Sequence, residues 1–226
     1  MPEMDVKKKD LKQILVHEAD RFWTDQNIAD RYDPERFHNS IWGRLYPILE
    51  ERIVAKALRK YAPGTRALDA ACGTGRVTLL LKKLGFIVIG CDISASMMNV
   101  ARRKVAENGI APSFVQTDAR FLPYRDSAFD IVSCVGLVMH LDQAPRVEVL
   151  KELRRVSRGT VIVQFGCSTP FLRLIQRITG RKAGNVKHPI DENQMEADIR
   201  ESGLKEEARS WVQRPLSSSV VLVLSK

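Results

Sequence analysis

The chain has 226 residues, of which 44% are hydrophobic and 28% charged, a composition typical of a folded globular protein and not of a disordered one. Its 36 Lys and Arg against 27 Asp and Glu give a net charge of +9, which indicates an anionic partner of some kind. No apolar run approaches the ~20 residues of a membrane-spanning helix, and the N-terminus lacks the apolar core of a secretory signal. The four cysteines form no metal-binding motif, so we expect reduced thiols in a cytoplasmic protein.

Residues 1–60 are predicted to form a helical lid over the remainder of the chain. The sequence has helical character over residues 10–60. The residue before a proline is biased away from the helical conformation, so Tyr-Asp-Pro at 32–34 and Tyr-Pro at 46–47 should break this segment into pieces.

From residue 66 onward, strands and helices alternate. Nearly continuous apolar runs are typical of strands that are covered on both faces. The alternation therefore predicts a doubly wound α/β fold around a parallel sheet. Strands are expected at 66–70, 86–92, 113–116, 129–135 and 160–165, and helices at 75–84, 94–108 and 144–156.

The C-terminal part departs from this alternation. A helix at 191–201 ends before Gly203 and is followed by strands at 205–212 and 218–224. The connection between these strands is too short for a crossover, so the last strand should run antiparallel. We expect one domain over residues 61–226, built on a seven-stranded, mostly parallel sheet with an antiparallel last strand.

The segment Leu68 to Arg76, Leu-Asp-Ala-Ala-Cys-Gly-Thr-Gly-Arg, leads from the first strand into the following helix. Gly73 and Gly75 allow a positive φ and a close approach of a ligand to the backbone. The start of the helix offers free N–H groups, which suit an anionic group. A tight strand–helix corner would use the same glycines, so the turn alone does not assign a ligand.

Two acidic residues at further strand ends strengthen the prediction of a ligand site. Asp92 ends the second strand, where a carboxylate can accept both hydroxyls of a ribose, and Asp118 follows the third strand. The carboxyl ends of these strands border one crevice, so Asp69, Asp92 and Asp118 should meet there. Thr78 replaces the third glycine of the dinucleotide fingerprint, which argues against a nicotinamide cofactor.

These motifs resemble the class I S-adenosylmethionine-dependent methyltransferases over about residues 64–226, most specifically at 69–75, 90–94 and 116–119. The segment from Leu122 to Ser133 is similar to a passage of the ubiquinone/menaquinone-biosynthesis-like branch of small-molecule methyltransferases. The first glycine of the family's loop is Ala71 here, which should require only a modest adjustment of the backbone. The resemblance implies S-adenosylmethionine as the cofactor. We expect no metal, because no cluster of acids follows the fourth strand, where catechol-type enzymes have a magnesium site.

The resemblance also implies a role for each matching position. The loop backbone would face the methionine moiety, with Asp69 near its amino group. Asp92 would bind the ribose, and Asp118 would read the edge of the adenine. The expected cofactor contacts are Asp69, Ala71, Gly73, Gly75, Asp92, Ile93, Met97, Asp118, Ala119 and Val135.

Methyl transfer requires in-line alignment of the acceptor, and a base when the acceptor is a hydroxyl or an acidic carbon. His140, just past the fourth strand, is the candidate catalytic base, and a purely structural histidine is the alternative interpretation. His188 and Asp191 form a second candidate pair.

More than half of the excess charge lies in residues 168–189, a basic lid insert predicted to overhang the acceptor side of the crevice. This insert carries five basic residues and no acid. Its basic and apolar faces would suit an anionic membrane surface or an anionic acceptor, and a lid helix with a solvated basic face is the third reading. The basic residues are Arg173, Arg177, Arg181, Lys182 and Lys187.

We therefore expect methyl transfer to a small-molecule or lipid-like acceptor. We expect the protein to be cytoplasmic, and its charge would also suit peripheral contact with an anionic membrane. An RNA or protein methyltransferase and a non-catalytic S-adenosylmethionine-binding module are the alternatives. Nucleic acid is a weaker candidate for the acceptor than a small molecule, because residues 133–137 are Ser-Cys-Val-Gly-Leu and lack a nucleic-acid methyltransferase motif. The (Asn/Asp)-Pro-Pro-aromatic motif of nucleic-acid amino-methyltransferases would stand there.

Overall fold

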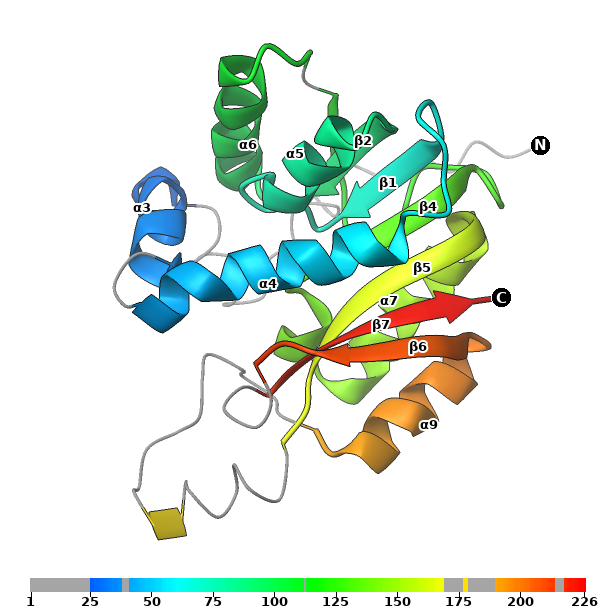
Figure 1. Ribbon diagram of the computed structural model, residues 1–226. Coiled ribbons are helices and arrows are strands. Elements are labelled where there is room, and N and C mark those ends of the chain that lie inside the picture. The colour runs from blue at the N-terminus through cyan, green and yellow to red at the C-terminus, as the bar shows by residue number, and fades with distance from the viewer. Residues whose placement is uncertain (1–24, 38–40, 112, 169–176, 179–189, 214–217) are drawn as a thin grey trace, which may run out of the picture.

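The computed structural model describes residues 25–37, 41–111, 113–168, 177–178, 190–213 and 218–226. A seven-stranded sheet lies at its centre, in the order β3-β2-β1-β4-β5-β7-β6 (Figure 1). The strands are β1 (Arg66–Ala70), β2 (Ile87–Asp92), β3 (Phe114–Gln116), β4 (Phe129–Cys134), β5 (Ser157–Gly166), β6 (Lys205–Trp211) and β7 (Ser219–Ser225).

The pairing of the strands confirms the predicted fold class. The first five strands run parallel to one another, whereas β7 pairs antiparallel with both β5 and β6. The direction of chain progress reverses between β1 and β4, which is the position where doubly wound sheets open a crevice. Strand β5 begins three residues before its predicted start, because α7 passes into it without a loop.

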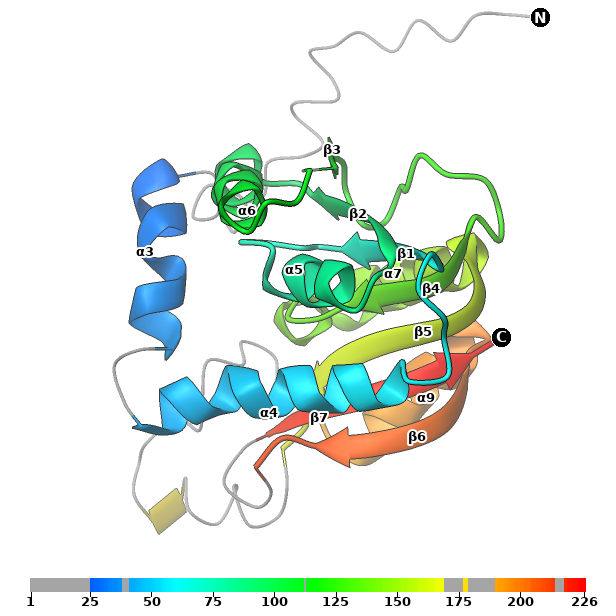
Figure 2. The same ribbon diagram turned by 45° about the horizontal axis from the view of Figure 1, so that its top comes forward.

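Helices cover both faces of the sheet (Figure 2). On one face α4 and α5 pack in a core that includes Val54 and Leu81, and on the other face α7 and α9 pack in a core that includes Leu150 and Ile199. The helices are α3 (Gln26–Phe37), α4 (Ile41–Ala57), α5 (Arg76–Lys83), α6 (Ala95–Glu107), α7 (Gln143–Val156) and α9 (Glu192–Ser202), with a 3-10 turn η1 (Val138–His140).

The predicted helix breaks at residues 32–34 and 46–47 are wrong. Pro34 lies inside α3 and Pro47 lies inside α4. A proline within a helix costs ~3 kcal/mol, so contacts elsewhere must offset it. Asp33, directly before Pro34, accepts a hydrogen bond from Thr74 Oγ1 at 2.9 Å, and Tyr46, directly before Pro47, donates to Ser219 Oγ at 2.7 Å. These tertiary contacts hold the helical conformation at the position where each proline disfavours it.

Parts of the predicted lids lie outside the described residues. Residues 1–24 and most of the basic insert 168–189 belong to this group, including His188. All four cysteines are buried free thiols, and burial raises the pKa of Cys91 to about 12, so this thiol is neutral and unreactive. Among the described residues, none of the helices combines the length and apolar character that crossing a bilayer requires.

Candidate active site

A cavity of about 940 Å³ opens at the carboxyl edge of the sheet. Its walls come from the segments that follow β1, β2, β3 and β4, from α3 and α4, and from the end of β5. The structure brings nine of the predicted site residues to this one cavity. These are Ala71, Gly73, Asp92, Ile93, Met97, Asp118, Ala119, Val135 and His140.

The two loop glycines have different roles. Both have a positive φ, 53° at Gly73 and 77° at Gly75. A Cβ on Gly73 would meet no atom within 4 Å, whereas a Cβ on Gly75 would lie 2.7 Å from the Cβ of Ala101 on α6. Gly73 therefore keeps backbone open toward the cavity, and Gly75, which does not line the cavity, permits the close packing of α5 on α6.

Ala71, where the family has a glycine, adopts the left-handed conformation with φ of 55°. An L-residue in this conformation costs roughly 1–2 kcal/mol. The loop thus keeps a left-handed conformation at this position with only a methyl side chain, and Ala71 lines the cavity.

Asp69 lies beneath the loop and not in the cavity wall. Its carboxylate accepts hydrogen bonds from Thr78 Oγ1 at 2.6 Å and from Ser133 Oγ at 2.8 Å. Burial raises its pKa to about 6, and these hydrogen bonds limit the rise. The side chain is therefore a buried tie between β1, α5 and β4, whereas the sequence interpretation placed it at a ligand amino group.

Asp92 holds the first two strand ends together. Its Oδ2 accepts from the Gly73 N–H and its Oδ1 accepts from the Ser94 N–H, both at 2.8 Å. Burial raises the pKa of Asp92, and these backbone donors oppose the rise by stabilising the charged form. Each carboxylate oxygen has a second lone pair, so the residue can accept further bonds from a ligand in the cavity.

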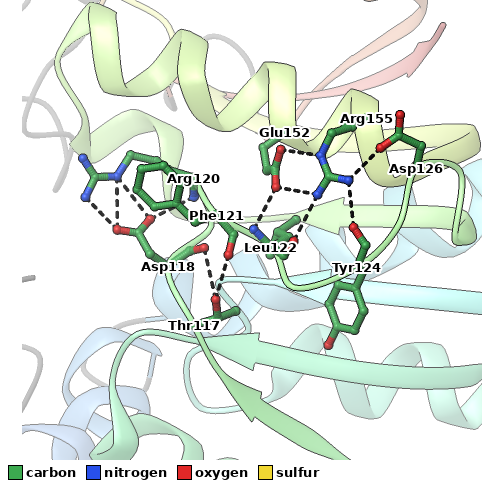
Figure 3. Close-up of polar contacts among 9 residues, drawn as sticks. All are labelled: Thr117, Asp118, Arg120, Phe121, Leu122, Tyr124, Asp126, Glu152 and Arg155. Atoms are coloured by element: carbon green, nitrogen blue, oxygen red, sulfur yellow. Dashed lines mark hydrogen bonds and ion pairs between the residues drawn. The ribbon is translucent and has the colours of Figure 1, made fainter. Parts of the chain in front are cut away.

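Asp118 stands at the end of the third strand and is paired with Arg120 (Figure 3). The guanidinium Nη2 donates to Asp118 Oδ2 at 2.6 Å, and the Arg120 backbone N–H donates to Oδ1 at 2.8 Å. Both residues line the cavity beside Ala119. Sequence reasoning missed Arg120, which neutralises the charge of this acid and fixes its orientation.

The loop that carries Asp118 is fastened to α7 through Arg155 (Figure 3). Arg155 donates to the Tyr124 carbonyl at 2.7 Å, to the Leu122 carbonyl at 3.0 Å and to the Asp126 carboxylate at 2.8 Å. Glu152 pairs with Arg155 and accepts from the Leu122 N–H at 2.8 Å. The segment that resembles small-molecule methyltransferases therefore has a structural role, which is to position the third strand end.

His140 ends the turn η1 and lines the cavity, so the candidate base lies in the same space as the predicted cofactor residues. The second candidate pair is not assembled among the described residues. Asp191 caps α9 instead, where its side chain accepts from the Gln194 N–H at 2.8 Å, and His188 lies outside the described residues. Within the described ranges, no group of His, Cys, Asp and Glu side chains could hold a metal ion.

Helix α3 supplies cavity residues that sequence reasoning did not identify. They are Tyr32, Asp33, Arg36 and Phe37. Besides its bond to Thr74, Asp33 pairs with Lys104 of α6 at 2.5 Å, and Arg103 pairs with Asp30. The helix is thus attached both to the glycine loop and to α6.

A buried polar cluster closes the cavity where β5 ends, and it was also not predicted. Glu50, 1% exposed, pairs with Arg76, and Arg76 also reaches Glu51 at 3.2 Å. Gln164 on β5, again 1% exposed, donates to Glu50. Glu50, Arg76 and Gln164 all line the cavity.

The chain is similar in sequence to known methyltransferases. Residues 67–159 match the model of a methyltransferase domain. A demethylmenaquinone methyltransferase of Staphylococcus aureus is 35% identical over 160 residues, which cover 68% of this chain and 62% of the relative. An uncharacterised protein of Mycobacterium bovis is 28% identical over 152 residues, which cover 62% and 54%. The chain thus spans between about half and three fifths of the length of these curated relatives.

The fold has solved counterparts. The magnesium protoporphyrin IX methyltransferase from Synechocystis PCC 6803, crystallised with bound SAH, superposes with a TM-score of 0.75 at 20% identity. The superposition covers 95% of this chain and 99% of that one. The matched domain and the similar sequences show that the chain contains a methyltransferase domain, and its fold is the one seen in S-adenosylmethionine-dependent methyltransferases.

Proposed function

We propose that the chain transfers a methyl group from S-adenosylmethionine to a small-molecule or lipid-like acceptor by in-line displacement. The observation that carries the proposal is the convergence of Gly73, Asp92 and Asp118, from three successive strand ends, on one cavity. Ligand sites commonly measure about 300–1,000 Å³, so a cavity of about 940 Å³ leaves space for an acceptor beside the cofactor. Demethylmenaquinone and magnesium protoporphyrin, named for two similar proteins, are small molecules.

The residues present fit this cofactor. The open side of Gly73 lets the methionine moiety approach the loop backbone, and the free oxygen lone pairs of Asp92 suit two ribose hydroxyls. Ile93 and Met97 offer apolar contact to the adenine. Asp118 and the Ala119 N–H offer polar contact to the adenine edge, and Val135 offers a carbonyl to the cofactor amine. Asp69 supports the loop from below.

When bound, S-adenosylmethionine supplies an already activated methyl group, so the protein mainly has to align the acceptor. The acceptor atom bonds to the methyl carbon as the sulfur–carbon bond breaks, and the sulfur keeps the electron pair. In this proposal His140, which lines the cavity, takes the proton from a hydroxyl or N–H acceptor. Residues 1–60 act as a lid, for which the attachment of α3 through Asp33 and its position at the cavity are the support.

Residues 168–189 carry an excess of positive charge. The proposal therefore includes contact of the protein with an anionic membrane surface or with an anionic acceptor. The cavity itself is not basic among the residues described. Its wall holds three arginines, and two of them are paired with acids, Arg76 with Glu50 and Arg120 with Asp118.

A radiolabel assay tests the proposed function. The purified chain is incubated with methyl-labelled S-adenosylmethionine and a cell lysate separated into lipid, small-molecule, RNA and protein pools. Label in the lipid or small-molecule pool is expected. Label only in RNA or protein would favour the macromolecular alternative, and binding of the cofactor without transfer to any pool would favour a non-catalytic binding module.

A further inference from the structure

The buried polar cluster at the end of β5 contains an amide whose orientation is fixed. The Gln164 Nε2 lies 2.7 Å from the Tyr46 hydroxyl and 2.8 Å from Ser219 Oγ, and it also donates to the Glu50 carboxylate. A carboxylate held by Arg76 can only accept, so the nitrogen of the amide, and not its oxygen, must face Glu50. The Gln164 Oε1 consequently points the other way.

That oxygen faces the cavity. It lies 4.0 Å from the position that a Cβ on Gly136 would occupy, and both Gln164 and Gly136 line the cavity. No donor among the described residues makes a hydrogen bond to Oε1. A polar atom on a side chain that is only 1% exposed usually has a partner, so the orientation of this oxygen indicates a ligand that donates a hydrogen bond.

The sheet order places this oxygen on the acceptor side. The predicted cofactor contacts follow β1, β2, β3 and β4, whereas Gln164 stands on β5, beyond β4 in the sheet. An anionic group at this position would meet the carbonyl oxygen of the amide, and the cation behind it, Arg76, is already paired with Glu50. The end of the cavity therefore favours an uncharged donor, such as a hydroxyl or an N–H group.

We propose that Gln164 is a specificity-determining residue whose Oε1 accepts a hydrogen bond from a hydroxyl or N–H group of the methyl acceptor. Glu50 is a positioning residue, because its carboxylate fixes which end of the amide faces the cavity. The inference rests on the proposed methyl transfer, and it adds that the acceptor has a neutral donor group at the β5 end of the cavity.

The test uses the lysate pool that accepts label from methyl-labelled S-adenosylmethionine. Serial dilution of this pool gives the amount required for half-maximal transfer, and calorimetry gives the affinity for S-adenosylmethionine. Gln164→Leu removes both ends of the amide, and Gln164→Met is the second variant if the first does not fold. Glu50→Gln removes the carboxylate that fixes the orientation of the amide, and with it the charge that pairs with Arg76. Gln194→Leu on α9, away from the cavity, is the matched control.

We expect Gln164→Leu to raise the half-saturating amount about tenfold or more, while the maximal rate and the cofactor affinity change less than about threefold. Glu50→Gln should give a smaller rise of the same kind, since the amide can then turn, and Gln194→Leu should give none. An unchanged half-saturating amount in both Gln164 variants would overturn the inference. A loss of cofactor affinity as large as the rise in the half-saturating amount would overturn it as well. If the wild-type protein labels no pool, the proposed function fails and the inference fails with it.

Discussion

The two walls of the cavity are built in different ways. The wall proposed to hold the cofactor, here called the cofactor wall, comes from short segments that each follow directly on one strand. Its carboxylate Asp92 is held by backbone N–H groups. The wall proposed to face the methyl acceptor, here called the acceptor wall, lies at the end of β5. Side chains from four elements hold it, and it contains an ion pair whose carboxylate is buried. Its members are Tyr46, Glu50, Arg76, Gln164 and Ser219. A wall fixed by backbone tolerates side-chain changes better than a wall in which each side chain supports the next.

The acceptor wall should be the more easily broken, and Arg76→Met tests this most strongly. The substitution leaves the Glu50 carboxylate, 1% exposed, without its cation. Breaking a buried pair in this way costs about 3–5 kcal/mol, so the free energy of unfolding should fall by that amount in urea titrations. Adding Glu50→Gln to the variant removes the unpaired charge and should restore part of the loss. A loss below about 1 kcal/mol in the single variant would show that the pair does not hold this wall.

Substitutions at the two glycines of the loop should affect stability and cofactor binding differently. Gly75→Ala combines left-handed strain with a contact to Ala101 at 2.7 Å, so we expect a loss of about 2–4 kcal/mol in the free energy of unfolding. Gly73→Ala has the strain alone, about 1–2 kcal/mol, but places a methyl group toward the cavity and should weaken S-adenosylmethionine binding. Equal effects of both variants on stability would contradict the assignment of Gly75 to helix packing.

The pH dependence of stability tests the buried tie under the cofactor wall. Burial raises the pKa of Asp69 from 3.8 to about 6, so the folded state binds this proton more tightly than the unfolded state. The corresponding stability is fully present below about pH 4 and is lost as the pH rises through about 6. The difference is at most about 3 kcal/mol, from about 1.4 kcal/mol per pKa unit. Asp69→Asn, which does not titrate, should show a shallower fall of stability between these pH values, and parallel curves would contradict the shift.

Weakening the attachment of α3 should have the smallest effect on global stability. Lys104→Met removes one partly exposed ion pair with Asp33, worth less than ~1 kcal/mol. We expect faster hydrogen exchange of α3 amides and little change in global stability, and high salt should produce a similar increase in the wild-type protein. Lys151→Met, which removes an exposed pair with Glu201 on the opposite face, is the control. If both variants leave the exchange of α3 unchanged, the ion pair does not hold the helix.

The difference between the walls also explains what the sequence could predict. The strand ends, the glycine turn and the two acids Asp92 and Asp118 are local patterns, each readable within about ten residues. Their meeting at one cavity follows from the topology of a parallel sheet. The sequence therefore predicted the seven-stranded sheet and most of the residues that meet at the cavity.

The acceptor wall could not be predicted in this way. Glu50 and Gln164 are 114 residues apart and belong to no motif, so only the packing of α4 on β5 brings them together. Pro34 and Pro47 were expected to end helices, but the tertiary contacts of Asp33 and Tyr46 override the local preference. Asp69 was expected at the ligand for its position at a strand end, but its buried carboxylate accepts hydrogen bonds from Thr78 and Ser133 and does not line the cavity.

Calorimetric titration of S-adenosylmethionine into the wild-type protein and Asp92→Ala is the most direct test of the central claim, which is that the cavity is a cofactor site organised by Asp92. Two hydrogen bonds to a carboxylate contribute about 1.5–3 kcal/mol each, so we predict a loss of affinity of about 100-fold or more. Glu201→Ala on the exposed end of α9 should bind as the wild type does. An Asp92→Ala affinity within about threefold of the wild type, or no binding by the wild-type protein, would contradict the account.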